Sequence, residues 1–200
     1  KEFASDLVNL FFPLQCLGCN TPLTPHEKDI CVHCQLQLPF TYFHLDGNNP
    51  MVQKLNTLLK IEAATALCYF EKNSILERML YQLKYSGQQQ LGAYFGSLMG
   101  ELLKHIKDFQ NVQAVIPVPL HSKRKRERGY NQATLFGGVI AQHLGVPFVE
   151  GFLLRTRNTK QLAKTKDDRN AVLKNTFELN LKKNNPKHWL LVDDVITTGA

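Results

Sequence analysis

The sequence lacks the hydrophobic segments that would attach it to a membrane. A membrane-spanning helix needs about 20 consecutive apolar residues, and every apolar run in these 200 residues is much shorter. Residues 1–6 also lack the charged start and apolar middle of a secretion signal. We therefore expect a cytoplasmic protein that does not insert into a membrane. The first residue is Lys1 rather than methionine, so we expect an N-terminal segment to precede it.

Acidic residues are scarce relative to basic ones. The chain has 17 Asp and Glu against 24 Lys and Arg, which gives a formal net charge of +7. Such an excess favours polyanionic partners such as nucleotides, pyrophosphate or nucleic acid, and it is equally compatible with a role in solubility. The hydrophobic fraction of 44% is sufficient for a real core. The length fits one medium domain with a small appendage.

Cysteine is also infrequent, yet four of the five cysteines form two CxxC pairs, Cys16 with Cys19 and Cys31 with Cys34. Two such pairs can place four thiolates around one zinc ion, and a site closed by four cysteines has no position for a reactive water. Disulfides are the alternative, but the missing secretion signal favours a reducing compartment and therefore zinc. The pattern predicts a structural Zn²⁺ site.

We expect residues 1–45 to form this four-cysteine zinc-binding element, which resembles a zinc ribbon. So short a segment buries too little apolar surface for independent stability, so the metal should supply much of its folding free energy. His26 and His33 are expected to be exposed loop residues rather than ligands. Cys68 is interpreted as a small buried apolar residue.

The remainder of the chain has the pattern of an α/β domain. We expect a connector over residues 46–73, which starts at a turn-rich segment, and the main domain over residues 74–200. Apolar spacing predicts helices over residues 75–83, 91–106 and 130–144. Strands are expected over residues 64–70, within 113–120 and over 189–192. Lys84, at the end of the first helix, can either cap helix carbonyls or face a phosphate.

The last residues combine a buried strand with groups that can bind a sugar phosphate. Residues 189–192 are apolar without alternation, as in a strand covered on both faces, and Asp193 and Asp194 follow at the edge where ligands of open α/β sheets bind. Paired carboxylates can accept hydrogen bonds from a vicinal diol, and the Thr-Thr-Gly turn that follows offers hydroxyls and amides to a phosphate. The alternative is a buried strand followed by an ordinary acidic turn.

A strongly basic stretch follows the strand within residues 113–120. Residues 121–132 contain five cations and one acid, and we expect them to form a loop that leads into a helix. This loop can stabilise departing pyrophosphate, bind nucleic acid through its phosphates or simply be solvated. The cationic segment 155–177 can form a hood over the site, with Gln161 near an acceptor base, or an exposed connector.

The order of these motifs resembles known families. The apolar strand, two acids and Thr-Thr-Gly turn resemble the phosphoribosyl pyrophosphate (PRPP) loop of type I phosphoribosyltransferases. The whole chain resembles the ComF family of competence-associated phosphoribosyltransferase-like proteins. The motifs that carry this resemblance are the double CxxC element, Pro117-Val118-Pro119-Leu120, Arg124, Arg128-Gly129-Tyr130-Asn131-Gln132, Leu154-Arg155-Thr156-Arg157, Gln161, Arg169-Asn170, Phe177 and Asp193-Asp194.

The resemblance implies a type I phosphoribosyltransferase-like parallel sheet flanked by helices. It also implies transfer of a phosphoribosyl group from PRPP to an unidentified acceptor, with Asp193 and Asp194 as the catalytic pair. Mg²⁺, which keeps much of its water shell near phosphates, would bridge pyrophosphate and ribose oxygens. The implied PRPP-binding residues are Asp193, Asp194, Thr197, Thr198, Gly199, Ala200, Pro119, Leu120, Arg124 and Arg128. Family members continue past this point, so we expect further chain after Ala200, or another molecule, to cover the exposed sheet edge.

A second hypothesis is a non-catalytic nucleic-acid-binding or adaptor protein of the DNA-uptake machinery. In that case the basic loop would bind single-stranded DNA, with Tyr130 as a stacking side chain. The zinc element would then be a platform for other DNA-uptake proteins.

Overall fold

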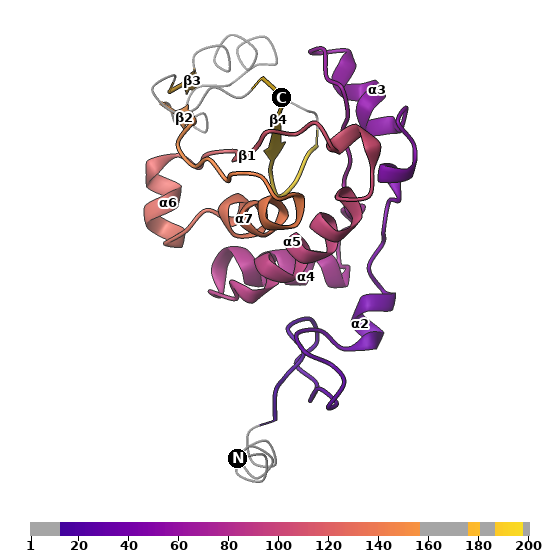
Figure 1. Ribbon diagram of the computed structural model, residues 1–200. Coiled ribbons are helices and arrows are strands. Elements are labelled where there is room, and N and C mark those ends of the chain that lie inside the picture. Colours follow the sequence, from indigo (N-terminus) through magenta and orange to yellow (C-terminus); the bar gives the residue numbers. More distant parts are fainter. Residues whose placement is uncertain (1–12, 157–175, 181–186, 198–200) are drawn as a thin grey trace.

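The protein, a computed structural model, is described over residues 13–156, 176–180 and 187–197. Helix α7 packs on strand β1, α5 packs on α7, and α4 packs on α5. The cysteine-rich segment extends from the α4 side (Figure 1). The helices are α2 (Val32–Leu36), α3 (Pro50–Asn56), α4 (Ile75–Tyr85), α5 (Gln90–Leu103), α6 (Ser122–Arg128) and α7 (Gln132–Leu144), with short 3-10 turns η1 (Phe43–Leu45) and η2 (Lys107–Phe109). The strands are β1 (Ala114–Pro117), β2 (Leu153–Arg155), β3 (Phe177–Leu179) and β4 (Trp189–Val192).

Strands β1 and β4 form a small parallel sheet. Pro117 at the end of β1 lies opposite Val192 at the end of β4, and Val115 also forms a parallel bridge to Phe148. Strands β2 and β3 pair antiparallel in a separate two-stranded sheet. The expected mixture of helices with a parallel sheet is therefore confirmed, including both of its strands. The carboxyl ends of β1 and β4 meet at one edge.

Strand β4 departs from the expectation that both faces are covered. Trp189 and Leu191 are 40% and 47% exposed, whereas Val192 is buried. The side chain of Phe152 meets the Trp189 ring edge-on at 5.8 Å and covers that face only in part. The apolar run thus reflects one covered face and one half-covered face.

Helices α5 and α7 approach each other closely because α5 carries a glycine at every fourth position. A side chain at Gly96 would meet the Phe136 carbonyl oxygen at 2.7 Å, and Gly92 and Gly100 lie equally close to side chains of α7. Residues four apart share one face of a helix. The three glycines therefore form the contact surface on which α7, and with it the sheet, is positioned.

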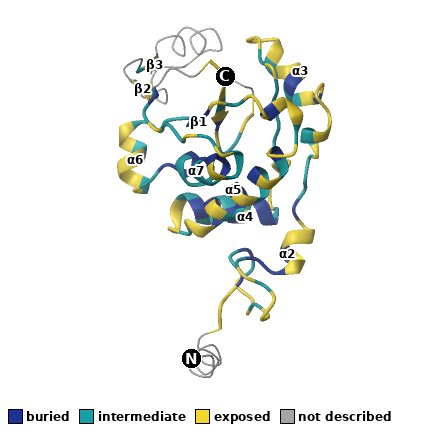
Figure 2. Ribbon diagram, in the orientation of Figure 1, coloured by how far each residue is buried: buried dark blue, intermediate teal, exposed yellow. Residues whose placement is uncertain are grey.

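Helix α4 begins with a variant of the capping box, in which Glu77 reaches the amide of the residue before the N-cap Ser74. The Ser74 hydroxyl accepts from the Glu77 amide at 3.1 Å, and the Glu77 carboxylate accepts from the Asn73 amide at 2.7 Å. The helix buries Ile75, Leu76, Met79 and Leu83. These side chains belong to one hydrophobic core with Cys16, Cys31 and Cys34, and Figure 2 shows that α4 has both buried and exposed residues. The cysteine segment therefore packs directly onto α4.

Two expected elements are wrong. Residues 64–70 form no strand: Cys68 makes a single isolated bridge to Phe40, and other backbone groups of the segment bind residues 39–41. Residues 122–128 form helix α6 rather than a loop, because Lys, Arg and Glu are good helix formers. His121 caps the first turn at the Lys123 amide, and Gly129 ends the helix with φ +79.

The described helices are all too short or too polar to cross a bilayer.

Candidate functional site

The four cysteines of the CxxC pairs come together as predicted. Their Sγ atoms all lie within 4.8 Å of one another, and Cys19 Sγ lies 3.7 Å from Cys31 Sγ. Four sulfurs bound tetrahedrally at about 2.3 Å from zinc are about 3.8 Å apart. The backbone amides of Gly18 and Cys31 donate to Cys16 Sγ at 3.3 and 3.2 Å. The donor set therefore fits one metal ion, and no water-binding position is needed to complete it.

The surroundings of the cluster favour thiolates on its open side and exclude solvent elsewhere. Hydrogen bonds from Thr21 lower the pKa of Cys19 to about 6, whereas burial raises the pKa of Cys34. His26 and His33 are exposed and lie outside the cluster, as expected, but His33 belongs to helix α2 rather than to a loop. Cys68 is partly buried against the same core, and its burial raises its pKa to about 12.

The two acids and the loop after β1 lie at the same edge of the sheet. Asp193 and Asp194 follow β4 directly, and the Val118 amide donates to the Val192 carbonyl at 2.9 Å. The Asn131 side chain donates to the Val118 carbonyl at 2.9 Å. This hydrogen bond ties the start of α7 to the loop that contains Pro119 and Leu120. The strand register therefore brings two distant parts of the sequence to one edge.

Lys84 and Arg155 act on the two acids, and Lys54 contacts the turn that follows them. Lys84 Nζ lies 2.6 Å from Asp194 Oδ2, with 20% and 18% of the two side chains exposed. Lys54 donates to the Thr197 carbonyl. Burial and Arg124 lower the pKa of Arg155, whereas Asp193 raises it, so Arg155 is linked electrostatically to both Arg124 and Asp193. The acidic edge, which we define as Asp193 and Asp194, is thus partly neutralised by positive side chains from separate elements.

Asp193 has an unusual protonation behaviour. Although the residue is exposed by surface area, protein groups around its carboxyl displace water. This desolvation and the adjacent Asp194 raise its pKa to about 6, against the opposing effects of the Asp194 amide, Lys84 and Arg155. The carboxyl therefore titrates just below neutral pH.

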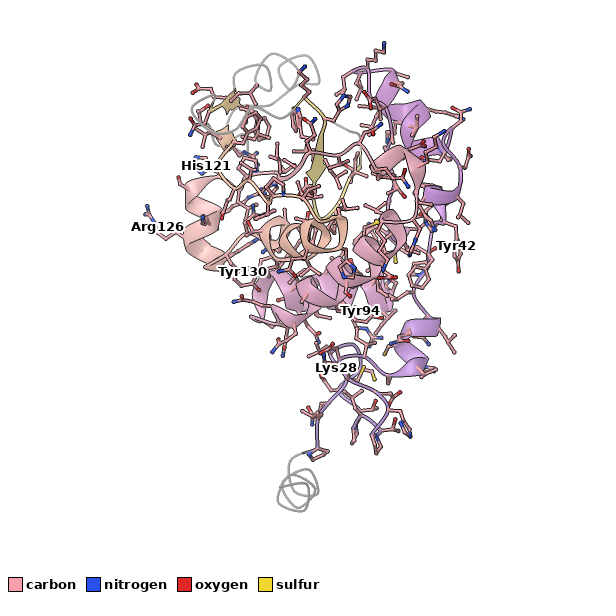
Figure 3. All side chains as sticks on the ribbon, in the orientation of Figure 1. Lys28, Tyr42, Tyr94, His121, Arg126 and Tyr130 are labelled. Atoms are coloured by element: carbon pink, nitrogen blue, oxygen red, sulfur yellow. The ribbon has the colours of Figure 1, made fainter. Side chains whose placement is uncertain are left out.

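The other predicted residues are only partly gathered at this edge. Arg128 is engaged elsewhere: it donates to Gln132 Oε1 at 2.9 Å and to the Tyr85 hydroxyl at 3.3 Å. Tyr130 is partly buried and donates to the Leu83 carbonyl, so its ring packs on α4 instead of offering a stacking surface (Figure 3). Thr197 is exposed. Thr198, Gly199 and Ala200, and Gln161 with the rest of 157–175, lie outside the described residues.

Sequence reasoning under-weighted Lys84. In the structure the Lys84 ammonium pairs with Asp194, and its expected role in phosphate binding stays a prediction. The signal was its place one residue after Leu83 on α4, beside the buried face yet close enough to cross to the sheet edge. Arg155 was predicted only as part of a cationic segment and of the Leu154-Arg155-Thr156-Arg157 motif, because its interaction with Asp193 depends on tertiary structure.

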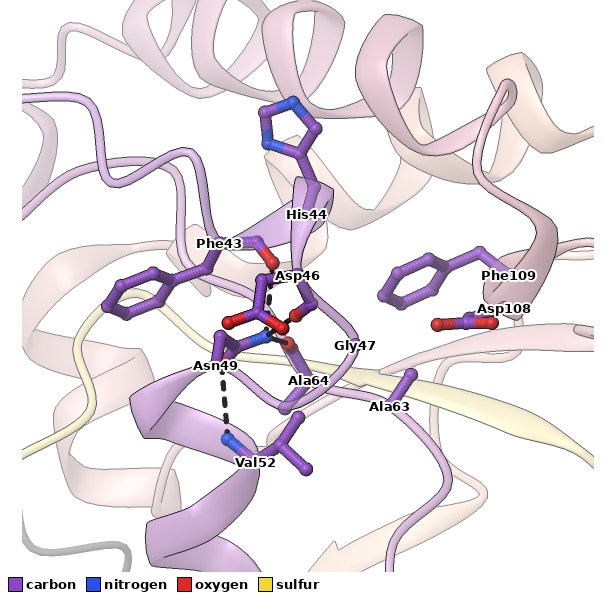
Figure 4. A pocket seen from close by; sticks show the side chains of 10 residues that line it. All are labelled: Phe43, His44, Asp46, Gly47, Asn49, Val52, Ala63, Ala64, Asp108 and Phe109. Carbon is purple, nitrogen blue, oxygen red and sulfur yellow. Dashed lines mark hydrogen bonds between the residues drawn. The ribbon is translucent and has the colours of Figure 1, made fainter.

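A small hollow beside the connector is not a ligand site. It is lined by residues of η1, the 46–49 turn and η2, and its cavity volume is about 10 Å³, which is room for about one water molecule. Asn49 is 2% exposed, and its side-chain amide donates hydrogen bonds to the carbonyls of Phe43, Asp46 and Ala64 (Figure 4). Asn49 therefore holds the connector together.

Comparison with known proteins gives relatives along nearly the whole chain. Competence protein F of Haemophilus influenzae is 30% identical over 204 aligned residues, which cover 95% of this chain and 88% of that protein. DNA utilization protein YhgH of Escherichia coli O157:H7 is 27% identical, with 96% and 88% covered. Competence protein ComFC of Bacillus subtilis is 28% identical over 128 residues, with 64% and 50% covered. No family model matches the chain, and no solved structure does.

Proposed function

The chain belongs to the ComF family, and from this premise we propose that it acts in DNA uptake or DNA use and binds PRPP at the acidic edge. The names of its relatives, competence protein and DNA utilization protein, support the biological part. One observation carries the chemical part: the parallel pairing of β1 and β4 brings Asp193 and Asp194 beside the loop that leads into basic helix α6.

The acidic edge suits a ribose held between carboxylates and cations. Asp193 and Asp194 would accept hydrogen bonds from the 2- and 3-hydroxyls, and Thr197 and the residues after it would receive the 5-phosphate. Arg124 and the loop containing Pro119 and Leu120 would face the pyrophosphate. This arrangement is supported by the electrostatic effects of both Arg124 and Asp193 on Arg155.

The proposed reaction is phosphoribosyl transfer. The bond from C1 of the ribose to the pyrophosphate oxygen breaks, and pyrophosphate leaves with the electron pair. The acceptor nucleophile then bonds to C1 and loses its proton to water. The protein's contribution is electrostatic, because cations near the leaving group stabilise its charge as it develops. Mg²⁺ would arrive with PRPP and add to this stabilisation.

We further propose that the cysteine cluster holds one structural Zn²⁺, and that residues 74–200 adopt the type I phosphoribosyltransferase fold with 1–45 and 46–73 as zinc element and connector. The sulfur geometry supports the first point. The parallel sheet, with α7 packed against it, supports the second.

Calorimetric titration with PRPP, with and without Mg²⁺, tests the proposal. Asp193→Asn/Asp194→Asn should weaken PRPP binding at least about tenfold, because carboxylate acceptors for the diol are lost. The control Glu71→Gln/Asp108→Asn removes the same charge from two exposed acids away from the acidic edge and should bind like wild type. Absence of PRPP binding by the wild-type protein, or equal binding by both variants, would contradict the proposal.

A further inference from the structure

Helix α4 carries two tyrosines on the outside of the molecule that the core does not use. Tyr81 and Tyr85 are 61% and 62% exposed, and their ring centroids lie 4.9 Å apart at an interplanar angle of 44°. Residues four apart lie on one helix face, here the face away from Met79 and Leu83. The pair is therefore an aromatic surface open to solvent.

Arg128 at the end of α6 extends this surface. Its guanidinium lies 5.2 Å from the Tyr85 ring centroid and donates to the Tyr85 hydroxyl at 3.3 Å. The other arm of the guanidinium donates to Gln132 Oε1 at 2.9 Å, and Gln132 is 1% exposed. A buried group thus anchors Arg128, and three flat groups follow one another: Tyr81, Tyr85 and Arg128. We call this row the aromatic platform.

The helix that supplies Arg128 is strongly cationic. Helix α6 has five basic residues and one acidic residue, Glu127. Lys125 lies 3.5 Å from Glu150. Lys123 and Arg126 are exposed, and Arg126 points away from the body of the molecule (Figure 3). A positive helix therefore borders the platform.

We propose that the aromatic platform stacks against an unpaired base of single-stranded nucleic acid while α6 binds the neighbouring phosphates. Proteins that bind single strands combine aromatic rings with positive charge in this manner, because every base has a face for stacking. In a duplex those faces are covered by neighbouring bases. The inference extends the DNA-related part of the proposed function and does not depend on PRPP binding at the acidic edge.

The contribution of stacking is measured by fluorescence anisotropy with a labelled oligothymidine, using Tyr85→Ala and Tyr81→Ala/Tyr85→Ala. The single variant should weaken binding roughly 5- to 100-fold, as expected for the loss of one base-stacking ring, and the double variant should bind no better. Tyr85→Phe keeps the ring and should bind within about twofold of wild type. Tyr42→Ala is the matched control, since Tyr42 is also 61% exposed but lies directly before η1 and outside α4 and α6, and it should bind like wild type.

Two further probes separate stacking from charge. An oligonucleotide of equal length with abasic sites should bind wild type as weakly as oligothymidine binds Tyr85→Ala, and duplex DNA should bind weakly as well. Single-stranded RNA distinguishes the kind of strand. Lys123→Ala/Arg126→Ala should flatten the dependence of log affinity on log salt by about 0.7 for each phosphate that is no longer neutralised, whereas Tyr85→Ala should leave that slope unchanged.

The proposal is overturned if Tyr85→Ala binds oligothymidine like wild type, if Tyr42→Ala loses as much affinity, or if the abasic strand binds as tightly. The unfolding midpoints of all variants identify any loss of affinity that comes from misfolding. Tyr85→Phe keeps the ring, so it tests stacking even if Tyr85→Ala does not fold. The same variants are titrated with PRPP. Tyr85→Ala should retain PRPP binding, and a wild type that binds the strand but ignores PRPP contradicts the PRPP proposal alone.

Discussion

The cysteine cluster and the acidic edge are built in opposite ways. The cluster collects four identical donors from one short stretch of chain, and three of the four are buried. At the acidic edge the two acids meet cations from distant segments of the chain, and the paired side chains of Lys84 and Asp194 are 20% and 18% exposed. One arrangement is closed and uniform, and the other is open and mixed.

This difference predicts a difference in role. Each thiolate of a closed set is required, because losing one leaves the metal incompletely held. At the open edge Lys84 already neutralises Asp194 in the absence of ligand, so an incoming ligand exchanges one charged partner for another. We therefore expect the cluster to control stability and the edge to control ligand affinity.

The largest expected effect is the loss of stability on metal removal. Cys34→Ala, or treatment with a strong zinc chelator, should cost at least about 3 kcal/mol, because the metal-binding energy of such sites is folding energy. The cluster shares its core with Ile75 and Leu76 of α4, so the loss should extend beyond the N-terminal segment. Differential scanning calorimetry should show a fall in Tm of roughly 10 °C.

Cys68→Ala is the matched control for this experiment. Cys68 packs against the same core without belonging to the cluster, so the variant should retain one zinc per chain in a colorimetric metal assay, while Cys34→Ala should retain none. If Cys34→Ala were as stable as Cys68→Ala, the cysteine cluster would not control stability, and the proposed difference between the cluster and the acidic edge would be wrong.

The same difference explains what the sequence alone could predict. The cluster is encoded locally, so the spacing of Cys16, Cys19, Cys31 and Cys34 was sufficient to identify it. The acids were also found, because they follow a strand. The cations beside them were not predicted: the place of Lys84 directly after Leu83 was the one available signal, and the approach of Arg155 to Asp193 depends on tertiary structure.

Secondary structure shows a similar pattern. Helices with a full apolar face, such as α4 and α7, were predicted close to their observed limits. Helix α6 was missed because it has no buried residue, and its charge pattern was interpreted as a loop although its residue types favour a helix. The error over residues 64–70 has the reverse cause, since an apolar run there is held by irregular hydrogen bonds rather than by a sheet.

A smaller effect is expected for the ion pair at the acidic edge. Lys84→Met should lower stability by about 1 kcal/mol, at the upper end of the values for exposed pairs and below those for buried pairs, because Asp194 is left without its cation. Lys104→Met is the matched control: Lys104 also lies 2.6 Å from its partner, Glu101, but the two side chains are 35% and 55% exposed. Urea denaturation should detect little or no loss for the control.

A double-mutant cycle isolates this pair. In the Asp194→Asn background, Lys84→Met should cost much less than in wild type, since the unpaired charge is gone. Lys84→Arg should retain most of the stability because it keeps the charge. Equal costs for Lys84→Met and Lys104→Met would mean that the acidic edge is no more than an ordinary solvated surface.

The smallest expected effect is the response to acidification, which should raise folding stability and lower PRPP affinity. Asp193 has a pKa of about 6 in the folded protein and a lower one in the unfolded chain. Acidification from pH 7.5 to 5.5 therefore protonates it preferentially in the folded state, which favours folding. The same proton removes a carboxylate acceptor, so PRPP affinity should fall about fourfold in calorimetry.

The Asp193→Asn variant is the reference for this experiment, because PRPP phosphates also titrate near pH 6. The variant should show only the ligand's own pH dependence and no acid stabilisation from this site. If the single variant follows wild type in both measurements, Asp193 does not bind the sugar in its ionised form, and the acidic edge loses its proposed role.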